Sequence, residues 1–499
     1  MNNLWRENQQ QKATEEQLIK QLQEAKEAKN EATITRRISS QLEEIAYQQK
    51  EISDIQKQKA EQQTRIADQM RINAEFEKER AVAAQQTALE AYAQMETQKE
   101  IAEAQKKEAV QAQLKADSLA HLALARSLGS QASTQFAAGY PDLARLLCYA
   151  SWKFSAQNKE NLYQPEIFNA LSSTSEMSKQ WNIHIGSIRD IICHSEAGKD
   201  YLVTASQYGE IALWQIHPSG NVTLKKEIIA DSRYDFRRLQ IDAERKGLIA
   251  LSYSGQILYI DSLFHTTQID LNLVAPIGIE YLSDAWVVAC KSGEIFKISL
   301  TNGSSVLLYK HPHAITTFAK SRQEILLGDS QGGLFRLNPN GTTLELWKGI
   351  RQPITAIYKD QGIFALGYEN GRIIIGNLEK GTMEELVGHL SRITCLQLVN
   401  KRLFTSSYDG TVRLWNLDKD NKVGSFVVAE QKNWIYVFRI ENDRNLLITG
   451  NGKGELCISS ISPEVMAETI REKLSRNFTE EEWNYYIGEL SEYETFMQE

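Results

Sequence analysis

Residues 402–417 read RLFTSSYDGTVRLWNL, and this stretch decides the fold. An apolar run over 402–407 leads into the tight turn Tyr408-Asp409-Gly410, and a second run over 411–416 alternates in hydrophobicity, as in Val412 and Leu414. Period-two alternation is typical of a β-strand, and glycine supplies the positive φ that a tight hairpin turn needs. The stretch therefore predicts a β-hairpin closed by Gly410.

The same pattern recurs along the chain. Six further hairpins occupy residues 201–216, 247–261, 286–298, 324–337, 362–378 and 445–459. Their turn glycines and that of the first hairpin are spaced by 38 to 46 residues: Gly209, Gly255, Gly293, Gly332, Gly371, Gly410 and Gly454. A period of about 40 residues with three or four strands per unit is typical of a β-propeller. The sequence thus predicts an all-β, seven-bladed propeller over residues 177–462.

The sixth unit resembles WD40 repeats. It carries Gly388-His389 and, further along, the run SYDGTVRLWN over residues 407–416. The resemblance implies a hydrogen-bonded set inside the blade that stabilises it and takes no part in chemistry. The residues of that set are His389, Asp409, Trp415 and either Thr405 or Ser407.

The first and seventh units depart from this pattern. The first keeps Trp214 but has Tyr208 where the aspartate would stand. The seventh leaves the strand pattern at Ser462-Pro463 and lacks a fourth strand. Because an open sheet edge is unfavourable, we expect residues 178–184 (SKQWNIH) to supply that strand and close the ring.

Residues 1–115 predict a long, charged, coiled-coil-like helical arm. No glycine precedes Gly129, and residues 1–127 carry 19 basic and 21 acidic side chains among many strong helix formers. Sparse apolar residues recur at spacings of three and four, as in a coiled-coil seam. They are Leu18, Leu22, Ala25, Ile38, Leu42, Ile45, Ile52, Ile55, Ile66 and Met70. An oligomerising coiled coil, a solvated single helix held by Glu–Lys pairs and a disordered segment are all open.

Two short helical regions flank the predicted propeller, so the chain is multidomain. Residues 116–176 read as a helical hairpin, with a leucine-rich face and the turn Gly139-Tyr140-Pro141. Residues 463–499 form a helical tail in which Pro463 opens one helix. Thr479 and Glu482 form a capping box that opens another.

These flanks resemble bacterial STAND-type signalling NTPases that bear WD40 repeats. The tail string RNFTEEEW over residues 476–483 and the Ala/Leu-rich hairpin carry the resemblance. Such proteins have a phosphate-binding loop, but Gly198-Lys199 and Gly452-Lys453 are the only Gly-Lys pairs here and neither precedes Ser or Thr. The resemblance therefore implies only the sensor and scaffold half of that design.

The composition and motifs offer no catalytic, cofactor-binding or metal site. The net charge of -8 argues against bulk binding to nucleic acid or anionic lipid. No stretch approaches the apolar length of a membrane span, and the five scattered cysteines suggest buried thiols in a reducing compartment. His311-Pro312-His313 is the one local histidine cluster, and it stands where WD40 units often have Gly-His, so we expect a structural role.

The sequence favours a non-catalytic, cytoplasmic interaction scaffold. We expect a protein or peptide partner on the propeller face and homo-oligomerisation through the arm, with no nucleic acid and no direct membrane insertion. The alternative is a sensor subunit of a bacterial NTPase-driven signalling or defence system whose NTPase is on another chain. An enzyme that uses the propeller channel is a third class, which a convergent set of acidic or histidine residues would favour.

Overall fold

The computed structural model describes residues 8, 10–22, 24–25, 88–157, 162–196, 199–217, 220–282, 285–321, 324–338, 341–360, 362–377, 380–417 and 424–497. The chain divides into two compact units, Met1–Gln113 and Leu114–Glu499. In the first unit, residues 10–22 and 24–25 are helical, and Leu18 and Leu22 are exposed. The predicted seam residues from Ile38 to Met70 lie outside the described residues, so the coiled coil stays a prediction.

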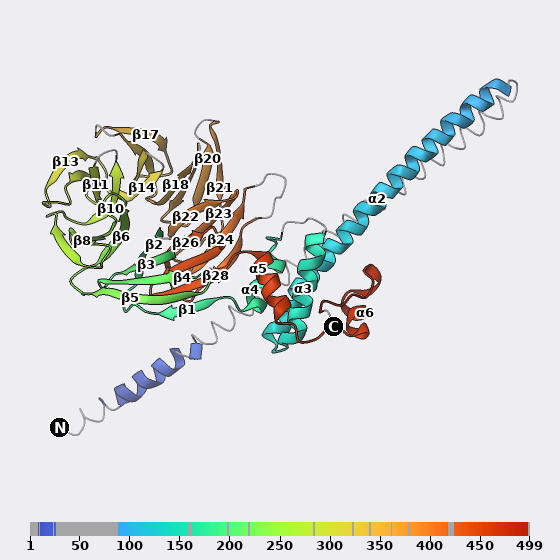
Figure 1. Ribbon diagram of the computed structural model, residues 1–499, viewed down its shortest axis with the longest axis horizontal. Helices are drawn as coiled ribbons and strands as arrows, with labels where there is room; N and C mark the ends of the chain where they lie inside the picture. The colour runs from blue at the N-terminus through green and yellow to red at the C-terminus, as the bar shows by residue number, and fades with distance from the viewer. Residues whose placement is uncertain are drawn as a thin grey trace. The chain divides into compact units, whose positions relative to one another are not determined.

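The second unit contains seven four-stranded antiparallel sheets arranged as a ring, which confirms the predicted propeller (Figure 1). The first blade contains β2 (Ile188–Glu196), β3 (Lys199–Ser206), β4 (Glu210–Ile216) and β5 (Val222–Ala230). The second contains β6 (Phe236–Asp242), β7 (Gly247–Ser252), β8 (Gln256–Ile260) and β9 (Thr266–Asp270). The third contains β10 (Pro276–Leu282), β11 (Ala285–Cys290), β12 (Glu294–Ile298) and β13 (Ser305–Lys310). The fourth and fifth are β14 (Ile315–Ser321), β15 (Glu324–Asp329), β16 (Gly333–Leu337) and β17 (Thr343–Lys348); β18 (Ile354–Asp360), β19 (Ile363–Tyr368), β20 (Ile373–Asn377) and β21 (Thr382–Leu386). The sixth is β22 (Ile393–Val399), β23 (Arg402–Ser407), β24 (Thr411–Asn416) and β25 (Phe426–Glu430), and the seventh contains β26 (Ile435–Glu441), β27 (Leu446–Asn451) and β28 (Glu455–Ser460).

The seventh blade takes its fourth strand from the N-terminal side of the ring. Strand β1 (Lys179–Asn182) pairs antiparallel with β28, with Lys179 opposite Ile458 and Asn182 opposite Glu455. The sheet order β1-β28-β27-β26 confirms the closing strand expected within residues 178–184. The two ends of the propeller are thereby joined by backbone hydrogen bonds.

Burial falls from the inner to the outer strands of a blade, and this explains the residue pattern. All six residues of β27 are buried, because this strand lies between two strands of its own sheet and between neighbouring blades. The outermost strand β21 is exposed along nearly its whole length. The apolar residues of the inner strands therefore build the core between blades.

Helices from both sides of the propeller pack into one core, which we call the helical module. It comprises the part of α2 (Ala88–Ala137) from Leu114 onward, α3 (Pro141–Gln157), α4 (Pro165–Ser175), α5 (Pro463–Glu472), α6 (Glu480–Tyr486) and the 3-10 turn η1 (Gly488–Leu490). The predicted helical hairpin is α2–α3, and the predicted capping box of Thr479 and Glu482 opens α6.

The helical module packs against blades six and seven. The ring of Phe168 on α4 meets Phe426 of β25 edge-on, with centroids 5.4 Å apart. The hydroxyl of Tyr163 donates to the carbonyl of Ile461, and the guanidinium of Arg402 lies 3.7 Å from the Tyr163 ring centroid. The tail contacts the hairpin where the rings of Tyr149 and Phe496 meet. Among the described helices, none is long and apolar enough to cross a membrane.

Candidate functional site

The seven turn glycines lie where one blade meets the next. Their φ angles range from 76° to 100°, a region that favours glycine. A Cβ on any of them would lie 1.8–2.8 Å from a carbonyl oxygen of the segment that leads into the following blade. At Gly454 that oxygen belongs to His184, so the seventh turn packs on the segment before the first blade. We call the seven turns and these seven leading segments the turn face.

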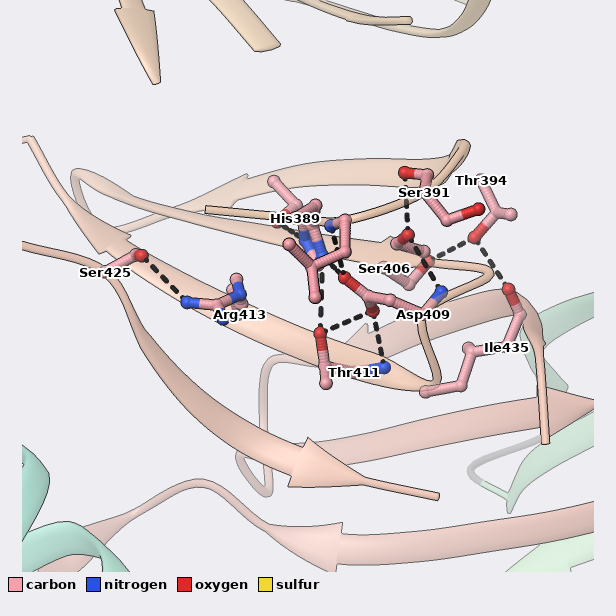
Figure 2. Close-up of polar contacts among 12 residues, drawn as sticks. His389, Ser391, Thr394, Ser406, Asp409, Thr411, Arg413, Ser425 and Ile435 are labelled. Atoms are coloured by element: carbon pink, nitrogen blue, oxygen red, sulfur yellow. Dashed lines mark hydrogen bonds and ion pairs between the residues drawn. The ribbon is translucent and has the colours of Figure 1, made fainter. Parts of the chain in front are cut away.

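The sixth blade brings the predicted residues together at this face. Figure 2 shows two of them, His389 and Asp409, pointing toward one another. The Nδ1 atom of His389 is 2.8 Å from a carboxylate oxygen of Asp409, and its Nε2 atom is 2.7 Å from the Thr405 hydroxyl. The indole of Trp415 donates to the same hydroxyl at 2.8 Å. Thr405 is thus the hydroxyl residue of the set, whereas Ser407 donates to the carbonyl of Ser391 and accepts from the amide of Asp409.

The carboxylate of Asp409 is held ionised by its neighbours. Burial opposes the charged form, but hydrogen bonds from His389, the Thr411 hydroxyl and the Leu390 amide favour it, and the net result is a pKa well below the usual range. A carboxylate that accepts several hydrogen bonds at a turn fixes the conformation of that turn. Both carboxylate oxygens of Asp409 accept hydrogen bonds from residues of the same blade or of the segment that leads into it. This arrangement is suited to stabilising the blade.

The first blade contains a second set that the sequence did not reveal. The Nε2 atom of His184 is 2.8 Å from the Thr204 hydroxyl, and the indole of Trp214 donates to that hydroxyl at 3.1 Å. The carboxylate comes from Glu210, which accepts from the amides of Ile185 and Gly186 and lies 3.7 Å from His184. Burial lowers the pKa of His184 to about 4, and the nearby Glu210 counteracts this only in part.

Two other blades keep part of the arrangement. The Nε2 atom of buried His311 is 3.1 Å from the Asp329 carboxylate, which gives His311 the structural position expected of it. In the seventh blade Gln431 stands in place of histidine and donates to the hydroxyl of Thr449 at 2.5 Å. The amide of Asn451 then stands in place of the aspartate and donates to Gln431. Asp329 and Asn451 each stand three residues before the turn glycine, where the sixth blade has Ser407, so these blades bond the side chain of the leading segment from a different position.

The blades differ in side-chain size at one repeated position of the turn face. Each first strand has a register shift that leaves one bulge residue near its start. In blades four, five and six this residue is threonine, and its hydroxyl donates to the first-strand carbonyl of the next blade. In blades seven, one and two it is a larger side chain: Tyr436, Arg189 and Arg237.

The larger side chains create an arginine–aromatic cluster, which we define as Arg189, Arg392, Tyr408, Trp434 and Tyr436. The rings of Tyr408 and Trp434 are stacked with centroids 5.0 Å apart, and Tyr436 meets Tyr408 edge-on at 5.0 Å. The guanidinium of Arg189 lies 4.0 Å from the Tyr436 centroid, and that of Arg392 lies 5.8 Å from Tyr408. Trp434 is 57% exposed and neighbouring Leu390 is 88% exposed. The cluster spans blades six, seven and one.

Charged side chains also lie deeper, on the first strands. Asp190 is almost fully buried and accepts from the guanidinium of Arg439 at 3.2 Å and from the amide of Leu239 at 2.9 Å. Burial raises the pKa of Glu280 to about 7, although Arg238 and Lys320 favour its charged form. Asp190 is thus engaged by arginine and by backbone, as a buried carboxylate must be.

The described residues hold no grouping of three or more His, Cys, Asp or Glu that could bind a metal ion. The described histidines that lie in the blade sets bond to hydroxyls and carboxylates of their own blades. The expectation of buried cysteines is met at Cys148 and Cys290, but it is wrong for Cys193, which is exposed. That side chain lies on β2, where Cys193 pairs with Leu202 of β3.

A comparison with protein families matches part of the propeller. The family model of the TEP-1 C-terminal β-propeller matches residues 389–459. A probable E3 ubiquitin ligase complex SCF subunit, scon-2, of Neurospora crassa is 31% identical over 87 residues, which are 17% of this chain and 12% of that protein. The match therefore spans only a small part of this relative's length.

Solved structures that are similar to this chain have low sequence identity to it. The WD40 β-propeller domain of Doa1 is 16% identical over 57% of this chain and 96% of its own, with a TM-score of 0.47. Sqt1 of Saccharomyces cerevisiae is 13% identical over 56% of this chain and 98% of its own, also at 0.47. The computationally designed Ika8 protein is 16% identical over 56% and 97%, at 0.42. The strand order shows a seven-bladed β-propeller, and the segment matched by the family model lies in its sixth and seventh blades.

Proposed function

We propose that this chain is a non-catalytic protein-interaction scaffold, cytoplasmic as expected from its sequence, whose propeller binds a protein or peptide partner on the turn face. The observation that supports this is the exposed Trp434 stacked on Tyr408 and flanked by two arginines on a closed ring. Trp, Tyr and Arg dominate the energetic centres of protein interfaces. Large exposed apolar side chains grouped on one face are typical of interaction sites.

The helical module and the proposed partner site use different residues of the propeller. It packs on the outermost strand β25 of blade six through Phe168 and Phe426, whereas Trp434 and Leu390 stay exposed. The turn face is therefore available to a partner while the module is docked. In this proposal the N-terminal arm oligomerises the chain and so presents several propellers at once.

Co-purification tests this function. Full-length chain and the Trp434→Ala variant are each isolated from the native cell, and proteins retained in stoichiometric amount are identified and quantified. We expect a partner that the wild type retains and the variant loses. The Leu344→Ala variant is the control, because Leu344 is exposed on the outer strand β17. Equal retention by the wild type and Trp434→Ala would contradict a partner site at the cluster.

The oligomer has a separate test. Light scattering compares the full chain with a chain that begins at Leu114, where the second compact unit starts. We expect a dimer or larger assembly for the first and a monomer for the second. A monomeric full chain would contradict oligomerisation through the arm.

A second candidate is the sensor subunit of an NTPase-driven bacterial signalling or defence system. The two segments that carry the resemblance, the hairpin and the tail, pack together: His121 bonds the carbonyl of Leu490, and Lys153 pairs with Glu494. A preserved hairpin–tail unit is consistent with a retained docking part for another chain. Co-purification of a P-loop protein that depends on residues 463–499 would favour this candidate, and a partner without any nucleotide-binding chain would count against it.

A further inference from the structure

The arginine–aromatic cluster carries an excess of unneutralised positive charge. Arg189 donates to the amide oxygen of Gln207 and stacks on Tyr436, and it has no described carboxylate within 4.0 Å. Lys432 and Lys453 are exposed and likewise form no ion pair with a described residue. The corresponding bulge residue of blade two, Arg237, pairs with Asp235 at 2.6 Å instead.

The lysines adjoin the exposed tryptophan. Lys432 precedes Trp434 by two residues in the segment that leads into β26. Gly452, directly before Lys453, donates its amide to the carbonyl of Trp434 at 2.9 Å. The guanidinium Nε of Arg189 is buried and has no hydrogen-bond partner among the described atoms. The exposed indole therefore lies on the same turn-face segments as Lys432 and Lys453, and Arg189 stacks on Tyr436 two residues further along.

The nearby acidic side chains are already occupied. Glu369 pairs with Arg392 at 2.5 Å, and Glu455 accepts from the side chain of Asn451 at 2.5 Å. A basic ligand would meet Arg189 and the lysines, whereas these two carboxylates are engaged within the chain. A carboxylate would form charge-assisted hydrogen bonds there, and these are stronger than hydrogen bonds between neutral groups.

We infer that the partner presents an acidic peptide segment to this cluster, with an Asp or Glu carboxylate at Arg189 and the lysines and an adjacent apolar side chain on Trp434. This inference rests on the proposed function, because it names the chemistry of the partner at the same surface. Opposite charge at the rim steers association and sets specificity, whereas the buried apolar contact supplies most of the affinity.

Peptide binding to the full-length chain tests the inference. The probes are fluorescein-labelled peptides with alternating glutamate and phenylalanine, and matched peptides with glutamine, lysine or phosphoserine in place of glutamate. Anisotropy is measured for the wild type, Arg189→Gln, Lys453→Gln, Trp434→Ala and the control Arg237→Gln. Lys453 is exposed, so its variant keeps the test valid should Arg189→Gln unfold.

We expect the glutamate peptide to bind and to lose about tenfold in affinity with Arg189→Gln or Trp434→Ala, a change of about 1.4 kcal/mol. Lys453→Gln should weaken binding by a smaller factor, Arg237→Gln should leave it unchanged, and salt should weaken it. Equal binding of the glutamine or lysine peptide, much tighter binding of the phosphoserine peptide, or an equal loss with Arg237→Gln would overturn the inference. If the native partner is lost with Trp434→Ala while the glutamate peptide does not bind, only this inference fails and the proposed function stands.

Discussion

The ring of Trp181 on the closing strand lies edge-on to Trp214 of the first blade, with centroids 5.9 Å apart. Trp181 belongs to β1, which pairs with β28 of the seventh blade, whereas Trp214 bonds to Thr204 within the first. Both rings pack in one apolar cluster with Ile188 and residues of β27 and β28. Side-chain packing across the junction therefore reinforces the backbone pairing that closes the ring.

Replacing Trp181 with alanine should weaken ring closure. The indole is half-buried between two blades, so we expect the free energy of unfolding to fall by about 1–3 kcal/mol. Urea unfolding followed by circular dichroism measures the change. Trp434→Ala is the matched control, since this tryptophan is mostly exposed and its loss should cost about 0.5 kcal/mol or less. Equal stability of the two variants would contradict closure by β1.

The hydrogen-bonded sets of blades one and six should contribute similarly to the free energy of unfolding. Thr405→Val and Thr204→Val each keep the side-chain shape but remove the hydroxyl that bonds one histidine and one tryptophan. We expect each to lower the unfolding free energy by about 1–3 kcal/mol, because buried donors lose their acceptor. Thr266→Val, at an exposed position on β9, serves as control. A Thr204→Val variant as stable as the control would show that the first blade does not depend on its set.

His184 should make stability depend on pH. Burial depresses its pKa to about 4 in the folded chain, against an ordinary value of 6.5. The unfolded chain therefore binds more protons between these values, and the stabilising contribution is present above pH 6.5 and lost as pH falls toward 4. Each unit of depression corresponds to about 1.4 kcal/mol. We expect His184→Gln, which copies Gln431 at the corresponding position, to lose less stability over this window than the wild type. Parallel pH profiles would contradict the prediction.

Glu280 should make stability depend on pH in the direction opposite to that of His184. Burial raises its folded pKa to about 7 from 4.5, so its contribution to stability is fully present below pH 4.5 and is lost as pH rises through 7. Glu280→Gln cannot ionise, and it should therefore become more stable relative to the wild type as pH rises across this window. Glu345→Gln, at an exposed position on β17, is the control and should show no such trend. A constant difference between Glu280→Gln and the wild type would refute this assignment.

The repeat pattern predicted the ring because each turn glycine has a steric reason to be glycine. At Gly454 a side chain would collide with the carbonyl of His184, and the strand pattern that ends at Ser462 left the seventh blade open for β1. These constraints act on the backbone and recur at a fixed spacing. The capping box at Thr479 is likewise a local pattern, so it could be identified without knowledge of the tertiary structure.

The hydrogen-bonded set of the first blade was missed because its histidine and its carboxylate stand at other sequence positions than those of the sixth blade, although they make similar contacts. Thr204, Gly209 and Trp214 have the same spacing as Thr405, Gly410 and Trp415. The histidine, however, lies farther from its threonine because the first hairpin of this blade is longer, and the carboxylate follows the glycine as Glu210. A search for aspartate before the glycine finds only Tyr208.

The arginine–aromatic cluster left a partial signal in the sequence. The run Trp434-Ile435-Tyr436 places a large ring at a bulge position where three other units have threonine. Aligning the first strands on their bulges would have revealed this difference. The partner of that ring, Arg189, lies on the first blade and meets Tyr436 only because the ring closes. Contacts across the closure have no local pattern in the sequence.

Hydrogen–deuterium exchange on the complex with the co-purified partner tests the central claim most directly. The free chain and the complex are compared peptide by peptide along the propeller and the helical module. A partner on the turn face should slow exchange in residues 185–190, 389–392 and 431–436, and leave the outer strands β13, β17 and β21 unchanged. Protection confined to the outer strands or to the helical module, with no change at the three turn-face segments, would contradict the account.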